Sequence, residues 1–203
     1  DGDEWVIHLQ KGEKIKSKIL INASGPWINE TLKKNIKIKS KNKIRLVKGS
    51  HIITKKLYKK DVAFTFQNTD KRIIFVIPYK KKFSLIGTTE VEVKSPENKE
   101  ISKKEIQYLI RSVNNYLEKQ ISTKDIVDSY SGIRPLIEDF NQASKVTRDY
   151  IFDLNIIKKL PLLSIYGGKL TTYRKLAENV LLDLEKFLPK TKMGPWTHKK
   201  NLF

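Results

Sequence analysis

Alternating apolar and polar residues near the start of the chain predict a β-hairpin, with Trp5 to Gln10 and Ile15 to Asn22 as its strands. Lys11-Gly12 supplies the turn between them. Four more apolar stretches then follow one another without a helical pattern between them: Arg45 to Thr54, Val62 to Phe66, Arg72 to Pro78 and Phe83 to Gly87. Strands in direct succession are typical of an antiparallel sheet, so we expect one in the middle of the chain.

Two stretches show the three- and four-residue spacing of apolar positions that predicts a helix. The first follows Ser102 to Glu105, a capping-box pattern, and its apolar face is Ile106, Leu109, Ile110, Val113 and Leu117. The second is predicted as one long helix from Leu170 to Leu188, which Pro189 stops. Further strands are expected at Ile126 to Ile133, Tyr150 to Leu154 and Leu162 to Tyr166.

Two strand-to-helix junctions rich in small residues flank the predicted sheet. In the first, Ile19 to Ile21 leads into a loop where Ser24 suits a helix cap and Pro26 the first helical turn. In the second, the strand ending at Tyr166 leads into Gly167-Gly168. We therefore predict an α+β chain with α/β-like edges. Its domains are residues 1–40 with 160–190, then 41–159, with 191–203 as the start of a further region.

Composition limits the classes of protein without selecting one. A length of 203 residues, 39% of them hydrophobic and 31% charged, fits a globular chain whose apolar runs are too short to span a bilayer. The absence of Cys excludes disulfides, thiolate zinc sites and a cysteine nucleophile, and the three His lie too far apart to predict a metal cluster. The chain opens Asp1-Gly2-Asp3-Glu4, so we expect its numbering to begin inside a longer protein.

The formal net charge of +19 fits three kinds of surface: one that binds nucleic acid, one attracted to an anionic membrane, and one that is simply rich in solvated lysine. The lysines fall mainly in loop-like places, and only six of the 41 basic residues are Arg, which nucleic-acid readers prefer for bidentate contacts. This distribution favours the solvated surface first and membrane attraction second, and it argues against nucleic acid.

The segment from Gly167 to Arg174 places two glycines where a strand ends and a helix begins. Free backbone N–H groups at such a turn suit an electron-rich ligand, either a phosphate or the pyrimidine edge of a reduced flavin, with Lys169, Thr171 and Thr172 beside it. An ordinary strand-to-helix turn capped by a threonine explains the same pattern equally well. The spacing is not that of a Walker A loop.

Arginine and histidine supply the other candidate chemistry. Arg134, Arg148 and Arg174 are half of all the arginines in a lysine-rich chain, and a guanidinium binds phosphate or carboxylate through two hydrogen bonds. A structural salt bridge, for instance from Arg148 to Asp149 or Glu138, is the alternative. His51, in a strand-rich segment, is a candidate proton acceptor, although a lone histidine is more often structural.

Eight segments together carry a family resemblance. They are Asn22 to Trp27, Lys48 to His51, Phe75 to Tyr79, Ile86 to Glu90, Gly132 to Leu136, Thr147 to Tyr150, Gly167 to Arg174 and Gly194 to Thr197. Their order and spacing resemble those of the FAD-dependent, membrane-associated glycerol-3-phosphate dehydrogenases over nearly the whole chain. Glu90 is a departure, because the family more often has Asp there.

This resemblance implies a flavoenzyme with a Rossmann-like FAD-binding domain and a substrate domain built mostly on an antiparallel sheet. The family's FAD domain begins with a G-x-G-x-x-G turn that holds the pyrophosphate, and this chain has none. The resemblance therefore implies a central part of a longer enzyme, inactive and almost free of flavin by itself. By motif, Asn22, Ala23, Ser24 and Gly25 would line the adenine–pyrophosphate side of FAD, and Gly168, Lys169, Leu170 and Thr171 its isoalloxazine end.

The implied reaction is the oxidation of sn-glycerol 3-phosphate to dihydroxyacetone phosphate, with hydride transfer to FAD and electrons passed to a membrane quinone. The substrate would be surrounded by Arg134, Arg148, Lys169 and His51, with Arg134, Lys169 and His51 closest to the chemistry. The resemblance further implies a peripheral protein at the anionic inner face of the cell membrane, with a homodimer allowed. The alternatives are a non-catalytic remnant of a split gene, a glycerol-3-phosphate oxidase that uses oxygen, and a basic module that binds nucleic acid or membrane.

Overall fold

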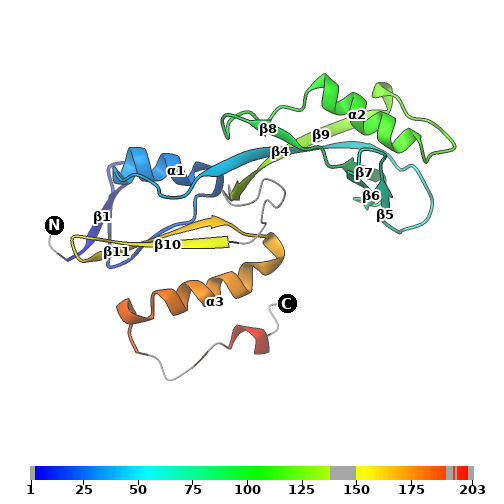
Figure 1. Cartoon of the computed structure of the whole chain (residues 1–203). Helices are drawn as coiled ribbons and strands as arrows, with labels where there is room; N and C mark the ends of the chain where they lie inside the picture. Colours follow the sequence, from blue (N-terminus) through cyan, green and yellow to red (C-terminus); the bar gives the residue numbers. More distant parts are fainter. Residues whose placement is uncertain (1–2, 138–149, 191–193, 195, 201–203) are drawn as a thin grey trace. The chain divides into compact units, whose positions relative to one another are not determined.

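The computed structural model describes residues 3–137, 150–190, 194 and 196–200. The chain divides into two compact units: unit 1 comprises residues 1–45 and 135–203, and unit 2 comprises residues 46–134. Both mix strands with a few helices, so the α+β class is confirmed (Figure 1). The predicted division into residues 1–40 with 160–190, 41–159 and 191–203 stays a prediction. The assignment of the units to cofactor and substrate stays a prediction.

The sheet of unit 2 has the strand order β5-β6-β7-β4-β8, with β9 also paired to β4. Its strands are β4 (Ile44–Lys55), β5 (Phe64–Gln67), β6 (Ile73–Tyr79), β7 (Phe83–Gly87), β8 (Val91–Val93) and β9 (Ile126–Ile137). The first five pair antiparallel with their neighbours, which confirms the four predicted strands. The sequence did not predict β8, because three residues are too few to show an alternation.

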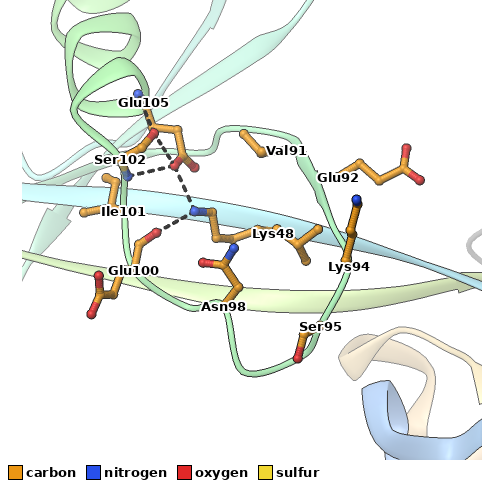
Figure 2. Close-up of a pocket in the computed structure, with 11 residues that line it drawn as sticks. Lys48, Val91, Glu92, Lys94, Ser95, Asn98, Glu100, Ile101, Ser102 and Glu105 are labelled. Carbon is orange, nitrogen blue, oxygen red and sulfur yellow. Dashed lines mark hydrogen bonds and ion pairs between the residues drawn. The ribbon is translucent and has the colours of Figure 1, made fainter.

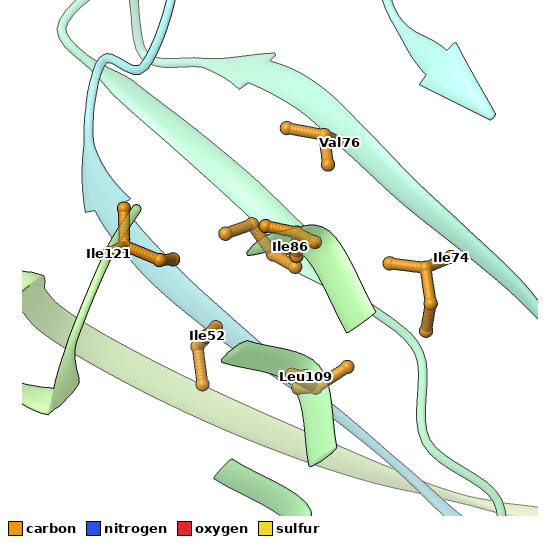
Figure 3. Packing of buried hydrophobic residues seen from close by; sticks show 7 residues of the cluster. Ile52, Ile74, Val76, Ile86, Leu109 and Ile121 are labelled. Atoms are coloured by element: carbon orange, nitrogen blue, oxygen red, sulfur yellow. The ribbon is translucent and has the colours of Figure 1, made fainter. Parts of the chain in front are cut away.

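One face of this sheet is covered by α2 (Lys103–Asn114). Ile52, Ile74, Val76 and Ile86 from the strands pack with Leu109 and Val113 of the helix and with Ile121 (Figure 3). The predicted capping box is confirmed, since the Ser102 hydroxyl accepts from the backbone N–H of Glu105 and the Glu105 carboxylate accepts from that of Ser102. A short 3₁₀ turn, η3 (Thr123–Asp125), has a capping box of its own.

Unit 1 contains the predicted hairpin, formed by β1 (Trp5–His8) and β2 (Lys14–Ser17). The second predicted strand is divided, because β2 ends at Ser17 and β3 (Leu20–Asn22) joins a different sheet. The Ser17 hydroxyl donates to the Ile19 carbonyl over 2.6 Å and accepts from the Ile19 N–H, and this local turn interrupts the strand. In the other sheet β11 (Leu160–Gly167) lies between β10 (Tyr150–Ile157), its antiparallel partner, and β3, its parallel partner.

The helical segments of unit 1 are short. After β3 come η1 (Gly25–Trp27), α1 (Ile28–Glu30) and the π-type turn η2 (Thr31–Ile36). After β11 come η4 (Leu170–Thr172), α3 (Tyr173–Asp183) and η5 (Glu185–Phe187), and η6 (Thr197–Lys199) follows later. The predicted single helix from Leu170 to Leu188 is therefore wrong. Thr172 has non-helical backbone angles and its hydroxyl donates to the Lys169 carbonyl, while Leu184 ends α3 with ψ near 1°.

The cap predicted for the first junction is also wrong in its chemistry. Ser24 occupies the N-cap position, but its side chain caps no helix. The Ser24 hydroxyl instead donates to the Asn22 side-chain oxygen over 2.7 Å and lies 3.1 Å from the Thr31 hydroxyl. Two apolar clusters stabilise this unit, one around Ile28, Leu32, Leu162 and Tyr166 and one around Leu163, Val180 and Leu184. Among the described residues, no helix has the length and hydropathy needed to cross a bilayer.

Two neighbouring isoleucines of β6 allow a matched test of the core of unit 2. Ile74 is fully buried against α2, whereas Ile73 is 47% exposed. We expect Ile74→Ala to lower the free energy of unfolding by about 2–5 kcal/mol through lost contacts and a cavity. Ile73→Ala should cost less than about 1 kcal/mol. Urea denaturation followed by circular dichroism measures both, and equal losses would contradict the described packing.

Candidate functional site

The candidate site of unit 2 lies on one face of its sheet. Side chains alternate between the two faces of a strand, so Gly49 and His51 of β4 share one face while Ser50 and Ile52 share the other. Ile52 packs against α2, and the face that carries His51 is therefore the one opposite the helix. On β9 the same rule places Tyr130 and Arg134 together.

His51 is held between a glycine and an aromatic ring. Gly87 of β7 is its direct partner across the sheet, and a Cβ at Gly87 would lie 2.1 Å from His51 Cδ2. Only glycine leaves room for the imidazole at this position. On its other side the ring stacks on Tyr130, with ring centroids 4.9 Å apart and planes 9° from parallel. The position of the imidazole is thus fixed from two directions.

Arg134 makes a similar close approach to the backbone of β4. A Cβ at Gly49 would lie 2.6 Å from Arg134 Nη2, so the guanidinium occupies the space above this glycine. The same Nη2 donates to the Thr88 hydroxyl over 3.3 Å. The two motifs that the sequence analysis quoted separately, around His51 and around Arg134, therefore meet on one face of the sheet.

Two nitrogens of this site are buried with no hydrogen-bond partner in the described part of the chain: His51 Nδ1 and Arg134 Nη1. Such groups are costly unless a ligand or water completes their hydrogen bonds. Burial and, second, the charge of Arg134 lower the pKa of His51 below 6.5, so the imidazole is neutral near neutral pH. A fixed cation beside a neutral imidazole suits a ligand with a negatively charged oxygen and a proton to give up.

A buried ion pair lies on the opposite face of the same strands. Lys48 Nζ is 3.0 Å from Glu105 Oε2, and both side chains are 5% exposed (Figure 2). Burial alone would raise the pKa of Glu105, but hydrogen bonds from Ser102 and Ser50 and the contact with Lys48 outweigh it and lower the pKa to about 2. The pair lines a cavity of about 570 Å³ together with Lys94 and Asn98 among other residues. From the sequence, Glu105 was predicted only to cap a helix.

The predicted cofactor segments of unit 1 follow the carboxyl ends of two neighbouring strands of its three-stranded sheet. Asn22 of β3 is paired with Ser164 of the parallel strand β11, so the carboxyl ends of both strands lie on the same side of the sheet. Asn22 to Gly25 follows one strand end and Gly168 to Thr171 the other. Open α/β sheets bind their ligands at the carboxyl ends of their strands.

Both segments have the backbone that such a site needs. Gly25 and Gly168 have positive φ angles of 56° and 95°, and Leu170 is 89% exposed beside the second turn. Buried Asn22 fixes the first loop by donating to the Ile28 carbonyl over 3.1 Å. Glycine turns at neighbouring parallel strand ends, with an exposed apolar side chain, fit a dinucleotide with a planar ring system.

The remaining predicted site residues are placed differently. Lys169 belongs to unit 1, whereas His51 and Arg134 belong to unit 2, and Arg148 lies outside the described residues. Arg174 is bound within its own unit, because its Nη1 donates to Glu178 over 2.8 Å and to the Thr197 hydroxyl over 3.3 Å. The convergence of Arg134, Arg148 and Lys169 on one substrate stays a prediction.

Comparison with known proteins agrees with this geometry. A family model described as FAD dependent oxidoreductase matches residues 1–174, so the chain belongs to this family. It is 43% identical to a glycerol-3-phosphate dehydrogenase of Pseudomonas aeruginosa over 98% of its own length, and 38% identical to a D-erythritol 1-phosphate dehydrogenase of Brucella abortus over 96%. The chain spans about two fifths of the length of these relatives, 40% of each.

A solved structure shares the fold. The glycerol-3-phosphate dehydrogenase of Bacillus halodurans, complexed with FAD, has a TM-score of 0.71 and 26% sequence identity to this chain. The match covers 91% of this chain and 36% of that one. The resemblance inferred from the ordered motifs is thereby confirmed at the level of the family and its fold.

Glycine substitutions test the placement of His51. In Gly87→Ala the new methyl group would collide with the imidazole, so the ring should leave its position and its pKa should return toward 6.5. Gly132→Ala is the matched control, because nothing lies within 4 Å of a Cβ there. NMR titration of His51 measures both variants against the unchanged protein. An equal pKa in all three proteins would contradict the geometry.

Proposed function

We propose that the chain is part of an enzyme that oxidises sn-glycerol 3-phosphate at C2 to dihydroxyacetone phosphate, with FAD as hydride acceptor. The observation that carries the proposal is the pair of buried nitrogens without partners, Arg134 Nη1 and His51 Nδ1, on one face of the sheet. The P. aeruginosa relative named for this substrate, at 43% identity, supports the choice of substrate.

In this proposal the protein positions the substrate and controls one proton. The guanidinium of Arg148 binds the phosphate, while Arg134 and Lys169 stabilise the oxygen at C2 as it loses its proton. His51, neutral near pH 7, accepts that proton. FAD, held by Asn22 to Gly25 and by Gly168 to Thr171, takes the hydride from C2, which removes two electrons from the substrate. The C2 carbonyl of dihydroxyacetone phosphate results.

The proposal extends to the electron acceptor and to the cellular site. Electrons leave the reduced flavin for a membrane quinone, and the protein acts at the inner face of the cell membrane. A formal net charge of +19, carried mainly by lysine, supports attraction to anionic lipids. The homodimer stays a prediction from the family resemblance.

Anaerobic reduction tests the proposal directly. The protein, expressed from its complete natural reading frame, should be yellow with bound FAD and should bleach when glycerol 3-phosphate is added without oxygen. If only D-erythritol 1-phosphate bleaches the protein, the substrate is the one for which the B. abortus relative is named. If the yellow colour returns rapidly in air and peroxide forms, the electron acceptor is oxygen and not a quinone. A colourless protein would refute the flavin.

Arg134→Lys tests the role of the guanidinium. Lysine keeps the charge but loses the planar fork, so we expect turnover to fall roughly 100-fold, the scale of a lost charge-assisted donor. Arg111→Lys, an exposed arginine of α2, is the matched control and should keep its activity. Steady-state kinetics with glycerol 3-phosphate measure both. Unchanged turnover in Arg134→Lys would refute the assigned role.

The pH dependence of kcat/KM tests His51 as the proton acceptor. The acceptor must be neutral, and burial lowers the pKa of His51. Activity should therefore fall on the acid side with a midpoint below the ordinary histidine pKa of 6.5, because protonation then removes the acceptor. His51→Asn should abolish that acid limb along with most of the activity. An identical acid limb in the variant would assign the proton to another group.

A further inference from the structure

The buried network around Glu105 reaches every segment that builds the His51–Arg134 site. Glu105 Oε1 accepts hydrogen bonds from the Ser50 hydroxyl at 2.7 Å and from the Thr89 hydroxyl at 2.9 Å. The Ser131 hydroxyl in turn donates to the Ser50 hydroxyl over 2.7 Å. One carboxylate oxygen of α2 thus binds two hydroxyls directly and a third through Ser50, and each hydroxyl comes from a different segment of unit 2.

Each of these hydroxyl residues is adjacent in sequence to a residue of the site. Ser50 lies between Gly49 and His51, Thr89 follows Thr88, and Ser131 follows Tyr130. Adjacent residues of a strand point to opposite faces, which applies to Ser50 on β4 and to Ser131 on β9. Thr88 and Thr89 follow the end of β7, and there the hydroxyl of Thr88 binds Arg134 while that of Thr89 binds Glu105. The network therefore holds the helix side of the same backbone segments whose other side carries the imidazole, its stacking partner and the threonine bonded to Arg134.

The direction of the hydrogen bonds is fixed by charge. A carboxylate only accepts hydrogen bonds, so the Ser50 hydroxyl must donate to Glu105 and can accept the bond from Ser131. Lys48, through its contact with Oε2 and its bond to the Glu100 carbonyl, keeps Glu105 ionised in the interior. A backbone bond from the Ser50 N–H to the Thr89 hydroxyl, 2.9 Å long, closes the network.

We propose that Glu105, acting through Ser50, Thr89 and Ser131, is a positioning residue that sets the relative placement of His51 and Arg134. The hydrogen bonds of the network lie on the helix side of the sheet, so its effect on the reaction is indirect. This inference rests on the proposed function for its effect on turnover, but not for its effect on the geometry.

Ser131→Ala in the full-length enzyme is the main test. The variant keeps the ion pair, the cap of α2 and the pairing of β9 with β4, but it removes the hydrogen bond from Ser131 to Ser50 that links β9, which carries Tyr130 and Arg134, to the network. A displacement of about 1 Å at a catalytic group lowers turnover by up to about 100-fold, and we expect at least about 10-fold here. The titration of His51 should move up toward pH 6.5, since Arg134 and Tyr130, the groups that face the imidazole, are no longer held against it.

Ser129→Ala is the matched control, because Ser129 points to the same face of β9 two residues earlier and its hydroxyl takes no part in the network. Both variants should lower the thermal midpoint by no more than about 4 °C. Ser50→Ala, which removes two bonds of the network at once, should reproduce the loss of turnover and the shift of the His51 titration.

Turnover and the His51 pKa together distinguish failure of the positioning role from failure of the proposed function. If turnover and the His51 pKa in Ser131→Ala and Ser50→Ala equal those of Ser129→Ala, the positioning role is refuted. If the unchanged enzyme does not oxidise glycerol 3-phosphate, the proposed function fails instead, and NMR titration of His51 still decides the positioning role. A rise of the His51 pKa in both network variants, but not in Ser129→Ala, supports it.

Discussion

The close approach of two side chains to the backbone of a β-sheet is the constraint on which the candidate site depends. The guanidinium of Arg134 and the imidazole of His51 occupy the places where Cβ atoms of Gly49 and Gly87 would otherwise be. Because they lie against the backbone, one nitrogen of each is buried without a partner in the described structure. The depressed pKa of His51 follows from the same burial and from the neighbouring charge.

The two faces of this sheet carry different polar groups. One face carries two buried nitrogens without hydrogen-bond partners in the described structure, and the other carries hydroxyl and carboxylate oxygens and an ammonium group that bind one another. Most lysines of this strongly basic chain are exposed, but Lys48 is buried and paired with Glu105. A buried pair of this kind is weak evidence for stability by itself. In the positioning role proposed above, it holds the strands beneath the site.

Local patterns in the sequence predicted the hairpin, the strands of unit 2 other than β8, and the cap of α2, because each depends on residues close together along the chain. The interrupted helix after β11 was missed because a threonine hydroxyl turned to the Lys169 carbonyl, which periodicity does not reveal. His51 and Arg134 were predicted as site residues from their side-chain chemistry alone. That they lie on the same face of one sheet depends on strand pairing, which the sequence does not show. Gly87 lies opposite His51 only through the register of β4 and β7. The second role of Glu105 likewise required the fold.

A crystal structure of the full-length, FAD-containing protein with glycerol 3-phosphate tests the central claim most directly. The account predicts that oxygens of the substrate lie within hydrogen-bond distance of Arg134 Nη1 and His51 Nδ1, the two nitrogens that the chain itself leaves without partners. Substrate bound away from both nitrogens, with water completing their hydrogen bonds, would contradict it.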